Sequence, residues 1–157
     1  MAHEYRAAVS WKRGSDAFTD LKFSRAHQWS FDGGVTVPAS ASPHVVRLPF
    51  SRADAIDPEE ALVASLSSCH MLTFLYVAQK AGFVVDSYDD QAVGFMTKND
   101  RGKLFVSKVA LRPHIVFSGA KQPSDAELAD LHHHAHEECY IANSVLTEVV
   151  IEPHAAA

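Results

Sequence analysis

The sequence predicts an α+β fold in which antiparallel sheets surround two helices, one of them long, central and buried. Three observations lead to this fold class: residues 61–79 contain no charged side chain, segments of alternating apolar and polar residues lie on both sides of them, and a second helix start follows near residue 124. The length of 157 residues suits one domain with a sizeable core. We expect a single domain over residues 1–157 with these elements in order: an N-terminal meander over 1–50, a central helix over about 58–81, strands over 83–117, a second helix over about 124–140 and a final strand over 145–152.

The N-terminal meander follows from an alternating segment and a turn signal. Apolar and polar residues alternate over residues 5–11, which is typical of a half-buried strand. An Asp-Gly-Gly sequence at residues 32–34 separates two apolar runs and predicts a hairpin. Residues 39–57 hold two prolines and many small residues, so we expect a long loop with a short strand near residues 45 and 46.

The central helix carries signals at both ends. Pro58 suits the first helical position, and Glu59 and Glu60 place negative charge in the first turn. Lys80 and Gly82 are typical of a helix C-terminus. Apolar residues fall on every face between these ends, so we expect a helix buried on most sides, packed in a soluble domain and against a copy of itself.

Charge and polarity exclude several classes of partner. The uncharged helix is long enough to cross a membrane, but its seven polar side chains are too many for a lone helix in lipid, so we expect no membrane contact. A net charge of −5 argues against nucleic acid, which needs clustered Lys and Arg. Because His3, Glu4 and Arg6 precede only a short mixed strand, we expect no signal peptide and a cytoplasmic protein.

Two cysteines and a group of histidines are the candidates for chemistry. Cys69 lies in the middle of the central helix and Cys139 near the end of the second, where each could be a packing thiol or one half of a redox pair. His132, His136 and Cys139 follow at i, i+4 and i+7 and share a helical face, which could hold zinc although no H-E-x-x-H motif is present. Residue types and spacing leave these alternatives open.

Four sequence segments resemble the OsmC/Ohr family of osmotically inducible and organic hydroperoxide resistance proteins. They are DPEEALVASLSSCHMLTFL at 57–75, YDDQAVGFM at 88–96, VALRPHIVF at 109–117 and LHHHAHEECYIANSVLTEV at 131–149. The resemblance covers about residues 24–153 and implies an OsmC-like fold. It also implies a thiol peroxidase that reduces organic hydroperoxides in oxidative and osmotic stress defence, without a cofactor or a metal.

The resemblance implies a role for four residues. Cys69, in SSCH, matches the peroxidatic cysteine, and Cys139, in HEECYIAN, matches the resolving cysteine. Glu59, ten residues before Cys69, matches the family's glutamate. Arg25, in FSRAHQW, is our choice for its arginine, with Arg6, Arg13 and Arg47 as the alternatives. A guanidinium beside the sulfur would favour the reactive thiolate, and the carboxylate would hold the guanidinium in place.

The family also implies two reaction partners, an organic hydroperoxide substrate and a dithiol reductant, which for some members is a lipoyl-bearing protein. His70 after the cysteine, CYIAN in the second motif and a longer arginine segment all resemble the OsmC-type branch. The alternative function is a non-enzymatic stress protein that binds a metal or a small molecule through the His132/His136/Cys139 face.

The spacing of Glu59 and Cys69 predicts an assembly. Ten residues of helix rise about 15 Å, which is too far for the two side chains of one chain to share a site. Antiparallel packing of two central helices would bring Glu59 of one chain to Cys69 of the other. We therefore expect an intertwined homodimer with two composite sites.

Overall fold

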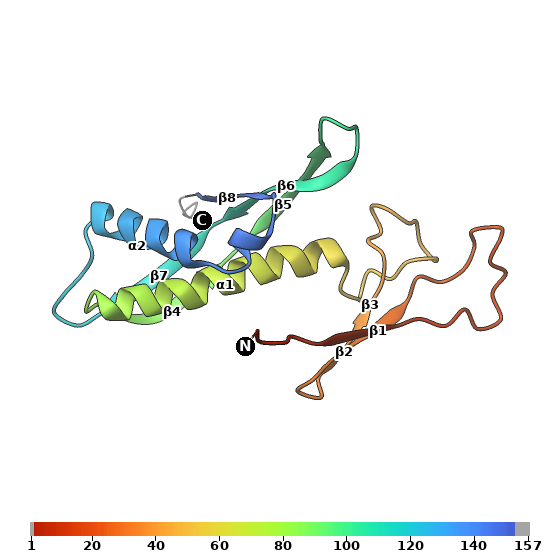
Figure 1. The fold of residues 1–157 in the computed structure, drawn as a ribbon, viewed down its shortest axis with the longest axis horizontal. Coiled ribbons are helices and arrows are strands. Elements are labelled where there is room, and N and C mark those ends of the chain that lie inside the picture. The colour runs from red at the N-terminus through yellow and green to blue at the C-terminus, as the bar shows by residue number, and fades with distance from the viewer. Residues whose placement is uncertain (1, 153–157) are drawn as a thin grey trace. The chain divides into compact units, whose positions relative to one another are not determined.

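The computed structural model describes residues 2–152, which form two compact units (Figure 1). The N-terminal unit ends at Ala61 and the C-terminal unit begins at Leu62. The elements are α+β, as predicted, and contain two α-helices, one short 3₁₀ turn and eight strands among the described residues.

An antiparallel meander forms the N-terminal unit. Its strands are β1 (Ala7–Ser10), β2 (His27–Phe31) and β3 (Thr36–Ala39), in the order β1-β2-β3. The predicted hairpin is confirmed, because β2 and β3 pair in antiparallel register around a turn in which Gly34 has a φ of 84°. The prediction of a half-buried first strand is wrong within this chain, since all four β1 residues are exposed and β1 pairs with β2 alone.

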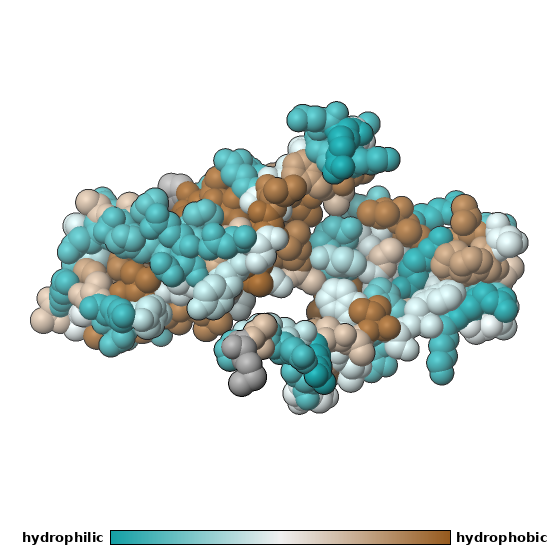
Figure 2. Space-filling model, in the orientation of Figure 1, coloured by the Kyte–Doolittle hydropathy of each residue, from teal (hydrophilic) through white to brown (hydrophobic). Residues whose placement is uncertain are grey.

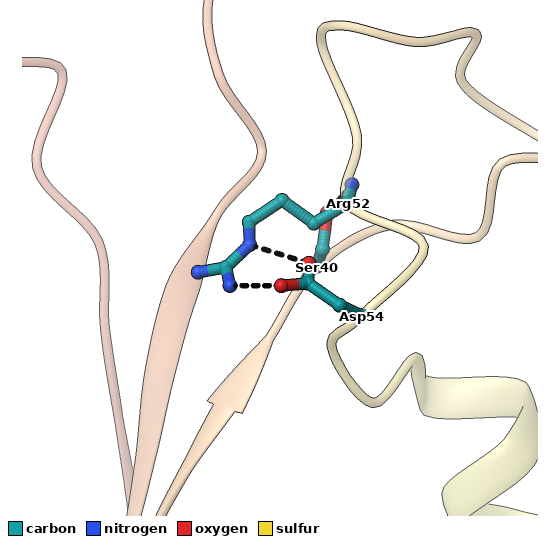
Figure 3. Close-up of polar contacts among 3 residues, drawn as sticks. All are labelled: Ser40, Arg52 and Asp54. Carbon is teal, nitrogen blue, oxygen red and sulfur yellow. Dashed lines mark hydrogen bonds and ion pairs between the residues drawn. The ribbon is translucent and has the colours of Figure 1, made fainter.

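A buried serine hydroxyl, an ion pair and a backbone turn hold the loop that leads to the first helix. The backbone N–H of Arg52 donates to Oγ of Ser40, which is fully buried, at 3.0 Å. The Arg52 guanidinium makes a bidentate ion pair with Asp54, at 2.9 and 2.7 Å (Figure 3). The predicted short strand near Val45 and Val46 is wrong: both N–H groups donate to the Ser42 carbonyl at 2.9 Å, which makes a turn there.

Helix α1 (Pro58–Lys80) begins and ends at the predicted signals. The Glu60 N–H donates to Oδ1 of Asp57 at 2.8 Å and the Asp57 N–H donates to Glu60 at 3.3 Å, which is a reciprocal capping box. At the other end Gly82 has a φ of 81° and the following N–H donates to the Ala78 carbonyl.

Within one chain, burial of α1 is confined to one face. The buried residues are Leu66, His70, Phe74 and Ala78, which are spaced by four. Leu72 and Tyr76 lie on another face and are 61% and 57% exposed. The length and apolar composition of α1 would allow it to cross a membrane, but the core helix of a globular domain can meet the same two criteria.

The C-terminal unit packs two helices against two sheets. β4 (Val84–Asp90) pairs with β7 (Pro113–Ser118), and β6 (Leu104–Leu111) lies between antiparallel β5 (Val93–Lys98) and parallel β8 (Glu148–Ile151). Helix α2 (Asp125–Glu138) opens with the predicted capping box between Ser124 and Glu127. The segment after α2 forms a 3₁₀ turn, η1 (Ala142–Ser144), so the last strand begins at Glu148 rather than at the expected residue 145.

Two apolar clusters hold α1 in this unit. One contains the buried residues Phe74, Ala78, Phe83, Leu131 and Ala135, and so joins α1 to α2. The other joins Leu66 of α1 to Val109 and Leu111 of β6. The middle of α1, which carries Cys69, is therefore fixed against both α2 and the sheet.

Replacing Gly94 with alanine is expected to destabilise the C-terminal unit by about 1–3 kcal/mol, because overpacking forces β5 and α1 apart. A Cβ on Gly94 of β5 would lie 2.6 Å from Cγ2 of Val63 in α1, and a β-branched side chain cannot easily turn away. Urea denaturation measures the loss. Gly33→Ala is the control, since a Cβ there meets no atom within 4 Å, and equal stability of the two variants would contradict the prediction.

Candidate functional site

The two cysteine side chains meet between α1 and α2. Cys69 is half-buried in the middle of α1, and Cys139, which is 1% exposed, follows the last turn of α2. Both are free thiols. Burial, together with a hydrogen bond that the Cys139 thiol donates to the Cys69 side chain, raises the pKa of the Cys139 thiol to about 11. Cys139 is therefore held as a thiol at neutral pH, beside the more accessible Cys69.

The turn after α2 holds Cys139 in place. Cys139 has non-helical backbone angles, φ −73° and ψ 110°, and its N–H donates to the His136 carbonyl at 3.3 Å. The Asn143 amide donates to the Glu137 and Cys139 carbonyls at 2.8 and 3.1 Å. Asn143 is a residue that the sequence analysis did not single out. Its position in CYIAN, just past the end of a helix, could have indicated this role, since an asparagine side chain there can donate to the unpaired carbonyls of the last turn.

A buried pair of histidines lies next to the cysteines. Nε2 of His70 in α1 is 3.0 Å from Nδ1 of His132 in α2, and the two rings stack with centroids 5.3 Å apart. His70 is 1% exposed and His132 8% exposed. Burial is the main reason that the pKa of each imidazole is lowered to about 4, and for His70 the neighbouring His132 and His136 contribute to that lowering. Both rings are therefore neutral at pH 7, so one imidazole donates the hydrogen bond between them and the other accepts it.

This pair was not predicted. In the sequence analysis, His70 was only a point of similarity to the OsmC-type branch, and His132 only part of a candidate zinc face. A signal was present in the sequence, because His70 lies four residues from both Leu66 and Phe74 and so shares their buried face.

The proposed zinc face does not assemble. His132 bonds His70, and Cys139 bonds Cys69, so these two side chains are already engaged. Among residues 2–152 no group of three or more His, Cys, Asp or Glu side chains could hold a metal ion. His133 and His134 are exposed on α2, 3.5 Å from Glu137 and 3.9 Å from Asp130 respectively. The surface over α2 is hydrophilic (Figure 2).

The other two predicted site residues belong to the N-terminal unit. Glu59 is half-buried at the second position of α1, and because Glu60 serves the capping box, Glu59 is not needed there. The Arg25 guanidinium donates to the carbonyls of Leu21, at 2.8 Å, and Phe23, and lies 3.7 Å from the centre of the Phe23 ring. The role of both residues beside the cysteines stays a prediction.

Lowering the pH from about 6.5 to about 4 is expected to destabilise the fold through the histidine pair. An unfolded histidine binds a proton near pH 6.5, whereas the folded pair stays neutral until about pH 4. The free energy of unfolding should therefore fall in this window by about 1.4 kcal/mol per pH unit for each neutral histidine. Above about pH 6.5 the pair should add no pH dependence.

Urea denaturation at several pH values checks this expectation. The matched control is the double variant His70→Gln, His132→Asn, whose amides retain a hydrogen bond but do not titrate. Carboxylates titrate alike in both proteins, so the difference between the two pH profiles reports the histidines. Identical profiles would contradict the prediction.

A model of the family "OsmC-like protein" matches residues 51–154. The fold is similar to an OsmC-like protein of unknown function from Vibrio cholerae, at 57% identity and a TM-score of 0.94, over 97% of this chain and 99% of that one. It is also similar to an organic hydroperoxide resistance protein from Elizabethkingia anophelis, at 17% identity and a TM-score of 0.72, over 99% of each chain. The corresponding protein from Legionella pneumophila shows 18% identity and a TM-score of 0.69, over 99% of each chain. No sequence among the curated proteins matches.

Proposed function

The chain belongs to the OsmC-like protein family, and from this premise we propose that it is a thiol-dependent peroxidase that reduces organic hydroperoxides to alcohols. The observation that carries the proposal is the contact between two free thiols from different helices, of which only Cys69 is partly accessible. Proteins named for organic hydroperoxide resistance share the fold. We assign the activity to oxidative and osmotic stress defence in the cytoplasm.

The first step is attack by the Cys69 thiolate on a peroxide oxygen. The O–O bond breaks, the terminal hydroxyl is transferred to sulfur, and the remaining alkoxide takes up one proton and leaves as the alcohol. Cys69 becomes a sulfenic acid, so its sulfur is oxidised and the peroxide is reduced. We assign Arg25 to favour the thiolate and hold the peroxide, and Glu59 to orient the Arg25 guanidinium. Leu72, which is exposed three residues after Cys69, offers apolar surface that suits organic hydroperoxides.

The second step is closure of the disulfide. The Cys139 thiol attacks the sulfenic sulfur of Cys69, the S–S bond forms, and the hydroxyl leaves as water. Cys139 is suited to this role because burial keeps it protonated and away from the peroxide until the sulfenic acid forms beside it. A dithiol, such as that of a lipoyl-bearing protein, then reduces the disulfide and restores both thiols.

The intact mass after peroxide treatment tests the proposal. One equivalent of cumene hydroperoxide should lower the non-reduced mass by about 2 Da without an adduct, because two thiol hydrogens are lost. Dithiothreitol should restore the original mass, and Cys139→Ser, the control, should gain oxygen instead. An unchanged wild-type mass would reject the function.

We also propose that the protein is a homodimer. Its support is the exposed face of α1, where Leu72 and Tyr76 lie outside the core of the single chain, together with exposed apolar surface in each unit (Figure 2). Because α1 runs without a break from Pro58 to Lys80, Glu59 and Cys69 are separated by about 15 Å along its axis. A second copy would bring the two residues into one site and would cover the exposed face. We expect no nucleic acid or membrane partner.

A further inference from the structure

We propose that the hydrogen bond between His70 and His132 fixes the register of α1 against α2, and that this register keeps Cys139 within reach of Cys69. His70 and His132 are then positioning residues for disulfide formation. The inference rests on the proposed function, because the step it serves is the resolving step of that reaction.

The hydrogen bond between His70 and His132 lies close to the two thiols whose distance depends on the register of α1 against α2. His70 is adjacent to Cys69 in α1, and His132 precedes Cys139 by seven residues, or about two turns of α2. The same two helices therefore meet at a histidine pair and at a thiol pair. A shift of one helix along the other would change both contacts together.

The apolar contacts between the helices do not specify this register by themselves. Phe74 and Ala78 of α1 pack against Leu131 and Ala135 of α2, and such burial is favourable but non-directional. A disulfide tolerates Cα–Cα separations of only about 4.4–6.8 Å, so a slip well short of one turn, about 5.4 Å, would prevent the bond. A directional contact near the thiols is needed to exclude such slips.

The hydrogen bond of the histidine pair is such a directional contact, because breaking it is energetically costly. Both rings are buried, so separating them would leave a donor and an acceptor without water or protein partners. Nδ1 of His70 has no partner among the described residues. Since an unpaired acceptor costs less than an unpaired N–H, we assign the proton to Nε2 of His70, which donates to Nδ1 of His132.

Stability alone does not explain two imidazoles at this position. Replacing a buried polar pair with apolar side chains of similar size is often neutral or stabilising. The surroundings already include the ring of Phe74, whose centroid is 4.6 Å from that of His132, so aromatic side chains are compatible with the site. A polar pair here serves specificity of packing.

The test measures the cysteine pair at equilibrium with glutathione, so that no peroxide chemistry is involved. Two thiols and one glutathione disulfide give the Cys69–Cys139 disulfide and two glutathione thiols, which balances atoms and electrons. The equilibrium constant is read from acid-quenched, thiol-trapped protein by intact mass. Cys139→Ser corrects for mixed disulfides.

Two double variants separate positioning from packing. In His70→Phe, His132→Phe the rings remain but the hydrogen bond is lost, and the equilibrium constant should fall by about tenfold or more while the protein stays folded. In His70→Gln, His132→Asn the amides occupy the bonding positions of Nε2 and Nδ1, and the constant should stay within about threefold of wild type.

Either of two results would overturn the inference: a Phe–Phe variant within about threefold of wild type, or a Gln–Asn variant impaired as strongly as Phe–Phe. If Phe–Phe does not fold, His132→Leu and His132→Asn replace the two double variants under the same criteria. Because glutathione is the oxidant, inactivity of the wild type toward hydroperoxides would reject the proposed function and leave this measurement intact. Normal peroxidase turnover with an unchanged constant in Phe–Phe would reject the positioning role alone.

Discussion

Cys69→Ser is expected to lower the consumption of cumene hydroperoxide to the uncatalysed rate. A serine hydroxyl is not ionised at neutral pH and lacks the nucleophilicity of a thiolate, so the first step is lost entirely. The Cys139 thiol cannot replace it, because Cys139 is buried and burial holds its pKa at about 11. Peroxide loss measured with a ferrous dye assay, in the presence of excess dithiol, checks the result.

Cys139→Ser provides the matched control at the second thiol. It should reduce about one equivalent of peroxide rapidly and then stall, with Cys69 trapped as a sulfenic acid or oxidised further. Comparable steady-state rates for the wild type and either variant would end the two-cysteine mechanism. Circular dichroism confirms that each serine variant is folded before its rate is interpreted.

Mixing two inactive variants is expected to restore activity if each site uses both chains. Glu59→Ala and Cys69→Ser should each be strongly impaired alone. When they are unfolded together and refolded, about half of the dimers are mixed, and each mixed dimer holds one intact site out of two. About a quarter of the wild-type activity per chain should return.

The control is the same mixture combined after separate refolding, which should stay inactive until the chains exchange. A monomer by light scattering at micromolar concentration would contradict the dimer. A dimer without rescue would show that Glu59 does not act on the Cys69 of a partner chain. Since α1 begins at Pro58 in the structure, a later helix start could not explain that outcome.

Features decided by neighbouring residues could be predicted from the sequence. Pro58, the acidic first turn and Gly82 gave the ends of α1, and Ser124 with Glu127 gave the start of α2, because capping acts within one turn. The Asp-Gly-Gly hairpin was predicted for the same reason. These elements place Cys69 on α1 and Cys139 at the end of α2 without any tertiary information.

Features decided by distant residues could not be predicted. His70 and His132 are 62 residues apart, and their hydrogen bond depends on how two helices cross. Val45 and Val46 favour a strand by residue type, but both of their N–H groups donate to the backbone carbonyl of Ser42, which makes a turn. The uniform apolarity of α1 did not show which face packs inside one chain, since periodicity carries no information when every face is alike.

Because Cys139 lies just past the end of α2, the movement that accompanies disulfide formation can be limited to the turn around Cys139. Forming the S–S bond requires the two sulfur atoms to approach further, and a residue with non-helical backbone angles can move without stretching the ladder of helical hydrogen bonds behind it. The 3₁₀ turn η1, which contains Asn143, is expected to move with Cys139, while the capped start of α2 stays in place. We therefore expect oxidised and reduced protein to differ mainly in one surface turn. A reductant that distinguishes the two forms has this turn to recognise, rather than a rearranged core.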